Sequence, residues 1–132
     1  MNNSDVKKIV NYWEKSAEHD IKTMDALFVK KRYSDSLFFG HIVLEKILKA
    51  NVVKETREQA PYTHNLVFLK ELVQLELEKK EVDLLDKINQ FNIRARYPDL
   101  KFAFYKKCNK KFTEFYLKEI KKLYKKICQA ID

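Results

Sequence analysis

Glycine and proline are almost absent from this sequence, which has one glycine and two prolines in 132 residues. β-Sandwiches and β-barrels need a turn about every 8–12 residues, and such turns depend on these two residue types. Phosphate-binding loops need several glycines close together, whereas Gly40 stands alone. The scarcity of both residues therefore excludes most β architectures and the Gly-rich nucleotide loops, and it leaves an all-helical protein.

Cysteines and long apolar runs are scarce as well. Cys108 and Cys128 are 20 residues apart, which is about 30 Å if both lie on one helix, so they cannot form a disulfide within the chain. No apolar stretch approaches the roughly 20 residues that span a bilayer. The first residues also lack the apolar centre of a signal peptide. These features predict a cytoplasmic protein with free thiols and no membrane segment.

Charged residues are abundant instead, at 35% of the chain beside 45% apolar residues. This balance is typical of one globular domain, here residues 1–132. The net charge is +8, and ten lysines but only three acidic residues lie after residue 100. A basic face attracts polyanions such as nucleic acids, whereas a lysine-rich composition can also arise from an AT-rich genome. Both explanations of the basic C-terminal part stay open.

Apolar residues recur every three or four positions, which predicts helices at about 5–31, 35–53, 64–77, 82–93 and 110–131. Short links connect them, so we expect an up-and-down antiparallel bundle of four to five helices. The segment 35–53 is apolar on most of its circumference, which is typical of a central helix or of a helix at an interface. Gly40 in its middle predicts a close approach to another helix. The apolar surface of the segment 35–53 exceeds what the interior of one bundle can bury, which predicts a homodimer.

Three polar residues interrupt this apolar helix at a spacing of four: His41, Glu45 and Lys49. They share one face, and Glu45 before Lys49 is the favourable order for an ion pair. Asp20, on the preceding helix, is a candidate partner across the helix pair. Two interpretations are open. The group is a structural network that fixes the helix register, or it positions Lys49 to bind a phosphate or an acidic partner.

Two of the four arginines lie in the string RARYPD at residues 94–99. Arg94 and Arg96 suit bidentate binding of a phosphate, and Tyr97 or Tyr62 suits stacking on a base. Pro98 restricts the residue before it to extended geometry, so the arginines would stand at a rigid break between helices. Alternatively the string is a helix stop, in which Asp99 caps the following helix and the arginines pair with nearby acids.

His64 opens the predicted helix 64–77, where it either makes a local hydrogen bond or adds a donor to a nucleotide site formed by Arg94 and Arg96, with Lys49 behind them. No spacing of histidine and cysteine is typical of a zinc site. No Ser-His-Asp or Cys-His combination is visible either. We therefore predict no catalytic residue, no metal and no cofactor.

Four segments carry a family resemblance: Trp13, Ala17 and Asp20; LFFGHIVLEKILKA at 37–50; THNLVFL at 63–69; and ARYPD at 95–99. In this order and spacing they resemble the HEPN (higher eukaryotes and prokaryotes nucleotide-binding) domain family over about residues 10–130. The resemblance implies a helical bundle that usually dimerises and for which nucleotide binding has been proposed. It also implies partnership with a minimal nucleotidyltransferase, often in a toxin–antitoxin-like pair.

Many HEPN proteins are metal-independent ribonucleases that carry an arginine, followed a few residues later by a histidine, near the start of the last long helix. No histidine follows His64 in this sequence. Arg57 lies at a matching distance before His64, but in another loop and with Pro61 between them, so we interpret that match as coincidence. The resemblance thus favours a non-catalytic binding module. The alternatives are a ribonuclease or toxin that uses His64 and an arginine, and an RNA-binding protein that uses the lysine-rich last helix.

Overall fold

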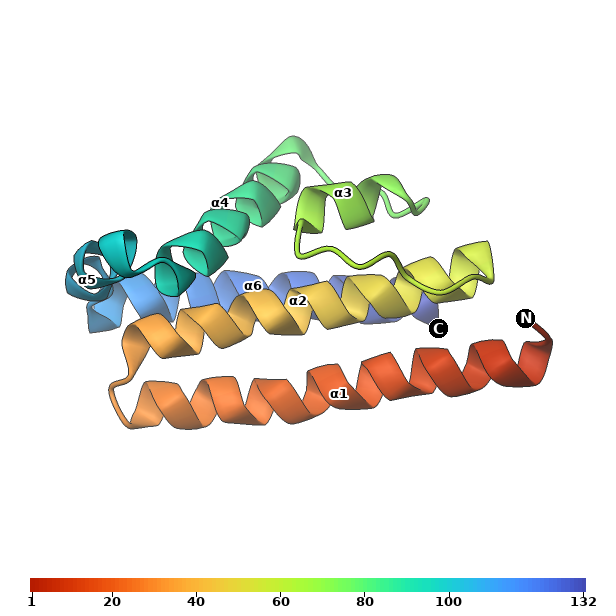
Figure 1. Cartoon of the computed structure of the whole chain (residues 1–132), viewed down its shortest axis with the longest axis horizontal. Coiled ribbons are helices and arrows are strands. Elements are labelled where there is room, and N and C mark those ends of the chain that lie inside the picture. The colour runs from red at the N-terminus through yellow and green to blue at the C-terminus, as the bar shows by residue number, and fades with distance from the viewer.

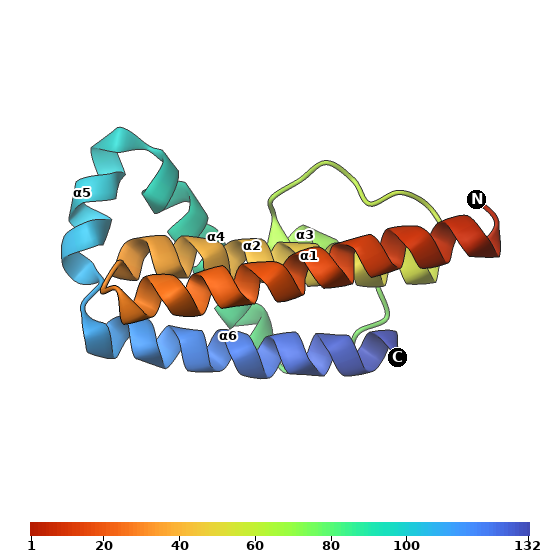
Figure 2. The same ribbon diagram turned by 90° about the horizontal axis from the view of Figure 1, so that it is seen from below.

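The computed structural model describes residues 1–132 and contains six helices and no strand, which confirms the predicted all-α fold (Figure 1). The helices are α1 (Asn3–Val29), α2 (Tyr33–Thr56), α3 (Leu66–Glu71), α4 (Lys79–Arg96), α5 (Pro98–Lys107) and α6 (Lys110–Ile131). The longer helices α1, α2, α4 and α6 alternate in direction along the chain, as expected for an up-and-down bundle (Figures 1 and 2). None of the helices is long and apolar enough to cross a membrane.

Six helices form, rather than four to five, because the chain is helical where a break was expected. Pro98 is the first residue of α5, a position at which its missing N–H would have no partner in the helix. It therefore ends α4 and starts α5 in one step. The prediction that Asp99 caps this helix is wrong, because the N-cap is Tyr97 and Asp99 lies exposed in the first turn.

The third helix is much shorter than the predicted segment 64–77. It begins at Leu66, because the side chain of Asn65 accepts hydrogen bonds from the amides of Val67 and Phe68. It ends at Glu71, and residues 74–78 that follow it are not helical. Residues 78–81, which fall between two of the predicted helices, instead start α4 through a capping box of Glu78 and Glu81.

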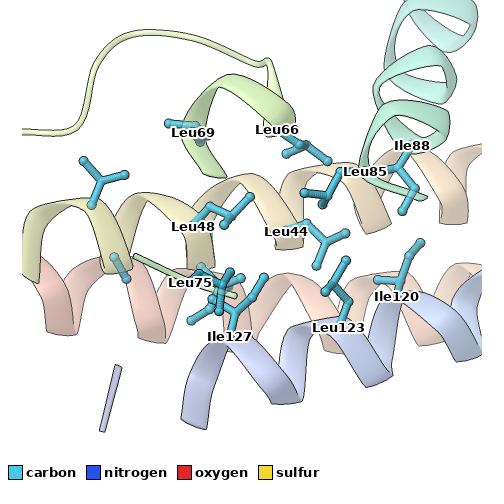
Figure 3. Packing of buried hydrophobic residues seen from close by; sticks show 14 of the residues in the cluster. Leu44, Leu48, Leu66, Leu69, Leu75, Leu85, Ile88, Ile120, Leu123 and Ile127 are labelled. Carbon is cyan, nitrogen blue, oxygen red and sulfur yellow. The ribbon is translucent and has the colours of Figure 1, made fainter. Parts of the chain in front are cut away.

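Helix α2 is the centre of the molecule, and α1, α3, α4 and α6 all contact it. Figure 3 shows Leu44 and Leu48 of α2 between the leucines of α3 and the isoleucines of α6. Most of the apolar circumference of α2 is therefore covered within one chain, and Phe38, Phe39 and Ile42 are only partly buried. Less apolar surface is left for a second copy than the sequence suggested, since α1, α3, α4 and α6 all pack on this helix.

Gly40 of α2 lies against side chains of both α1 and α6. A Cβ atom at this position would lie 2.6 Å from Ile120 Cδ1 of α6 and 3.5 Å from Met24 Sδ of α1. The first distance is too short for two carbon atoms, so a side chain here requires Ile120 to move. The glycine thus allows α6 to pack closely on α2. This packing offsets the low helix propensity of glycine.

We predict that Gly40→Ala interacts energetically with Ile120→Val, because the valine lacks the Cδ1 atom that the new Cβ would meet. In the Ile120→Val background, Gly40→Ala should be more favourable by about 1 kcal/mol than in the wild type. Urea denaturation of the four proteins measures this difference. The same cycle with Ile127→Val, a buried position on the same helix, is the control and should be additive. Additivity in both cycles would contradict the assigned contact.

Candidate functional site

Glu45 of α2 is the centre of a buried polar cluster. Its Oε2 accepts a hydrogen bond from Lys49 Nζ at 3.0 Å, and its Oε1 accepts one from His64 Nδ1 at 2.8 Å. Glu45 and Lys49 are only 9% and 6% exposed, so each charge needs a partner inside the protein. Lys49 Nζ also lies 5.3 Å from the ring centre of Trp13 on α1. The carboxylate therefore joins α2 to the loop that carries His64.

His64 connects this buried carboxylate to the surface. Its Nε2 is 3.3 Å from Nη2 of Arg96, at the end of α4. A guanidinium only donates hydrogen bonds, so Nε2 accepts and the ring proton lies on Nδ1, which donates to Glu45. The His64 side chain is 39% exposed, and Arg96 is exposed. A continuous chain of hydrogen bonds thus runs from Glu45 through His64 to an arginine in solvent.

His41 fixes the path of the backbone at this site. Its Nε2 is 2.8 Å from the carbonyl oxygen of His64, so that nitrogen carries the proton. Its Nδ1 accepts from Asn92 Nδ2 of α4 at 3.3 Å. Burial lowers the pKa of His41 below its ordinary value of 6.5 and keeps the ring neutral. The ring is therefore a neutral bridge that holds His64 above Glu45.

Asp20 and Asp99, the two acids that the sequence offered as a cross-helix partner and as a helix cap, lie outside this network. Asp20 of α1 binds Lys46 Nζ at 2.6 Å, and the same ammonium donates to Ser16 Oγ at 2.7 Å. Lys46 takes this place because successive residues of a helix point about 100° apart, so Lys46 faces α1 while Glu45 faces the loop. Asp99 makes no side-chain hydrogen bond and no ion pair. The proposed partnership of Asp20 with the His41–Glu45–Lys49 face is therefore wrong.

The predicted phosphate ligands also separate in space. Arg94 and Arg96 are two positions apart, which is about 200° around a helix, so they point to different sides of α4. Arg94 makes no ion pair and no side-chain hydrogen bond, and it is half-buried. Lys49 is buried and bound to Glu45, so it does not face a ligand in solvent. Tyr97 is exposed.

Two other residues of the site, Asn89 and Asn92, were not singled out from the sequence. Asn92 supports His41, and Asn89 of α4 accepts from the Leu66 amide at 2.9 Å and donates to Asn65 at 3.0 Å. Exposed Tyr62 has its ring centre 5.8 Å from that of His64. The sequence did contain a pattern that indicates these residues of α4. Residues 89, 92 and 96 recur at spacings of three and four and form a polar stripe on one side of the helix.

Arg96 and His64 form the part of the cluster that a solute can reach, and Tyr62 is beside them. A guanidinium with free N–H groups next to an imidazole suits an anion with several oxygens, and an exposed phenol ring suits a flat heterocycle. No group of histidine, cysteine and acidic side chains is arranged to hold a metal. Burial raises the pKa of the Cys108 thiol to about 12, so it is not a nucleophile at neutral pH.

Comparisons with known proteins agree on the fold of this chain. The sequence matches the profile of the HEPN domain over residues 10–131. A search of curated proteins gives no significant match. Among solved structures, the crystal structure of TT1696 from Thermus thermophilus is similar, with a TM-score of 0.77 and 17% sequence identity over 91% of this chain and 96% of that one. At this identity the likeness shows a shared fold.

We predict that Glu45→Ala lowers the free energy of unfolding by roughly 2–4 kcal/mol, because it leaves the Lys49 ammonium unpaired in an apolar setting. Urea denaturation at neutral pH measures the change. Glu114→Ala is the matched control, since Glu114 is an exposed acid on α6 without an ion pair, and it should change stability by less than about 0.5 kcal/mol. Equal stabilities of the two variants would show that the cluster carries no structural role.

Proposed function

The chain belongs to the HEPN domain family, and from this premise we propose that it is a non-catalytic binding module that takes a nucleotide at the exposed end of the Glu45–His64–Arg96 chain. The observation that carries the proposal is the position of Arg96, an exposed guanidinium held in place by a neutral imidazole. The imidazole is in turn held by a buried carboxylate. Such a fixed guanidinium loses little freedom when it binds a phosphate.

Each residue has its own part in this proposal. Arg96 uses one N–H group on His64 and keeps the others for phosphate oxygens. Tyr62 and Tyr97 are exposed and offer faces on which a base stacks. Lys49 stabilises Glu45 and contacts no ligand, and Arg94 lies on another side of α4. The site is therefore smaller than the set of residues that the sequence suggested.

Nucleotide titrations test this site. The Arg96→Ala variant should bind nucleoside triphosphates at least about tenfold more weakly than the wild type, which corresponds to roughly 1.4 kcal/mol. Arg94→Ala is the matched control, because it removes an equal charge two residues away and should alter affinity by less than about twofold at moderate salt. Calorimetry gives the affinities. Equal losses in both variants would mean that general positive charge, and not a site, attracts the nucleotide.

The proposal includes a cytoplasmic homodimer that partners a minimal nucleotidyltransferase in a toxin–antitoxin-like pair. HEPN domains often dimerise, which supports this assembly. Exposed apolar side chains on α3, on the residue after it and on α4 add support, because such surface is a common part of protein interfaces. These side chains are Phe68, Leu72 and Ile93.

Light scattering should give twice 15.9 kDa at micromolar concentration if the dimer forms. Ile93→Asp should shift the protein to the monomer, because it places a charge in the proposed interface. Phe115→Asp, an exposed aromatic residue on α6, is the control and should leave the dimer intact. A wild-type protein of 15.9 kDa would contradict the dimer.

A second function is favoured by one observation. The Glu45 carboxylate orients His64 and Arg96 lies beside it, an arrangement that also suits proton transfer during cleavage of RNA. Cleavage of a phosphodiester needs both a base and an acid, however, and His64 is one imidazole. His41 is buried, and its Nε2 proton is held by the carbonyl of His64. The single accessible imidazole and the burial of His41 therefore favour binding over catalysis.

We therefore expect that the purified protein cleaves RNA no faster than the background. The assay follows a fluorescent single-stranded RNA with the wild type, His64→Ala and Glu45→Gln. His19→Ala, which changes an exposed histidine on α1, is the control. Cleavage that His64→Ala abolishes, and that His19→Ala retains, would assign the protein to the ribonucleases of the family.

A further inference from the structure

The densest unpaired positive charge lies at one end of the bundle, on α5, on the start of α6 and on the turn between α1 and α2. Residues 101–111 contain five lysines and no acid, and residues 30–32 read Lys-Lys-Arg. Figures 1 and 2 show α5 beside the α1–α2 turn, at the end of the bundle away from both termini. Among these cations only Arg32 forms an ion pair, at 3.2 Å from exposed Asp35.

The lysines further along α6, at residues 118–126, are different. Lys121 binds Asp25 of α1 at 2.8 Å, and Lys126 binds Glu81 of α4 at 2.8 Å. Lys122 lies 3.7 Å from Glu119. The outer face of α6 is therefore partly neutralised by acids on its own and neighbouring helices. The lysines of α5, of the start of α6 and of the α1–α2 turn are not neutralised in this way.

Aromatic rings are exposed in the middle of this charge. Phe102 and Tyr105 are 65% and 63% exposed, and they lie three residues apart on one side of α5. Lys106 Nζ lies 4.6 Å from the ring centre of Phe102. Exposed apolar side chains that lie close together mark interaction sites on protein surfaces. Rings alternating with lysines are the pattern on which single-stranded nucleic acids stack.

The surface around these rings is hollowed. A pocket of about 460 Å³ separates Phe102 and Tyr105 from Arg32 and Ser34, and a second of about 320 Å³ lies between Tyr105 and Lys31. Tyr105 and Ser34 line both pockets, so the two hollows are neighbours. Hollows beside flat rings fit inserted bases. Helices that lie on lipid separate their apolar and basic faces strongly, whereas α5 separates them weakly.

We propose that this surface, the α5 end, binds single-stranded nucleic acid. We define the α5 end by Lys31, Arg32, Lys101, Phe102, Tyr105 and Lys106. Bases stack on the two rings, and the lysines and the arginine contact the phosphates between them. The recognition uses base faces and phosphate charge, so it is indifferent to the sugar. This function goes beyond the nucleotide site at Arg96, and it relocates the nucleic-acid surface from α6 to α5.

Fluorescence anisotropy with labelled oligouridylate and oligothymidylate of about ten nucleotides, a typical site size, tests the proposal. The Phe102→Ala/Tyr105→Ala variant should bind both oligonucleotides about tenfold or more weakly, with an unchanged dependence on salt. Lys101→Ala/Lys106→Ala should bind more weakly and reduce the slope of affinity against salt. Lys118→Ala/Lys125→Ala on α6 removes the same charge from exposed lysines without ion pairs, and should change affinity by less than about twofold.

Three results would overturn the proposal. Equal losses in the α5 and α6 lysine variants would indicate attraction by net charge alone. Full affinity in the Phe102→Ala/Tyr105→Ala variant would show that no base stacks there. Binding to vesicles rich in phosphatidylserine, without binding to either oligonucleotide, would assign the surface to membranes. Circular dichroism of each variant confirms that it is folded, and single variants of Phe102 and Tyr105 replace the double variant if it is not.

Discussion

Glu45 is a carboxylate on the helix that the rest of the molecule surrounds, and its two oxygens must find partners away from water. Lys49 supplies one from the same helix, and His64 supplies the other from a loop. The loop can do so only if it leaves the end of α2 and runs back along that helix. Arg57 starts this return with a left-handed backbone conformation (φ 60°), and His41 holds its end through the His64 carbonyl. The start of α3 and the last turn of α4 are then positioned around His64.

The sequence predicts the long helices well because apolar periodicity is a property of each segment alone. It also predicts the shared face of His41, Glu45 and Lys49, since a spacing of four fixes their relative direction on one helix. Contacts between side chains of different helices are harder to predict from the sequence. Lys46 rather than Lys49 contacts Asp20. This choice depends on how α1 is rotated about its axis relative to α2, and the apolar pattern of a single helix does not determine that rotation. The same limit applies to Arg94 and Arg96, which are close together in a motif but lie on different sides of a helix.

Local chemistry explains the remaining differences from expectation. Pro98 is a poor residue inside a helix and a good one at its first position, and the choice between these depends on the residues that follow it. Charge counts have a similar limit. The lysines of α6 and of the α5 end look alike in the sequence, yet acids from α1 and α4 neutralise part of the first set only. Pairing between helices, not composition, thus decides which basic surface remains available.

The central claim of this account is that buried Glu45 fixes the proton of His64 on Nδ1 and so presents Nε2 to Arg96. Long-range proton–nitrogen NMR spectra of the three histidines test this directly, because the ring nitrogens of the two neutral tautomers have distinct shifts. At neutral pH the account predicts a neutral His64 with its proton on Nδ1 and a neutral His41 with its proton on Nε2. Glu45→Leu, which removes the acceptor, should weaken the preference of His64 for Nδ1 and leave exposed His19 unchanged. A His64 ring protonated on Nε2 in the wild type would contradict the account.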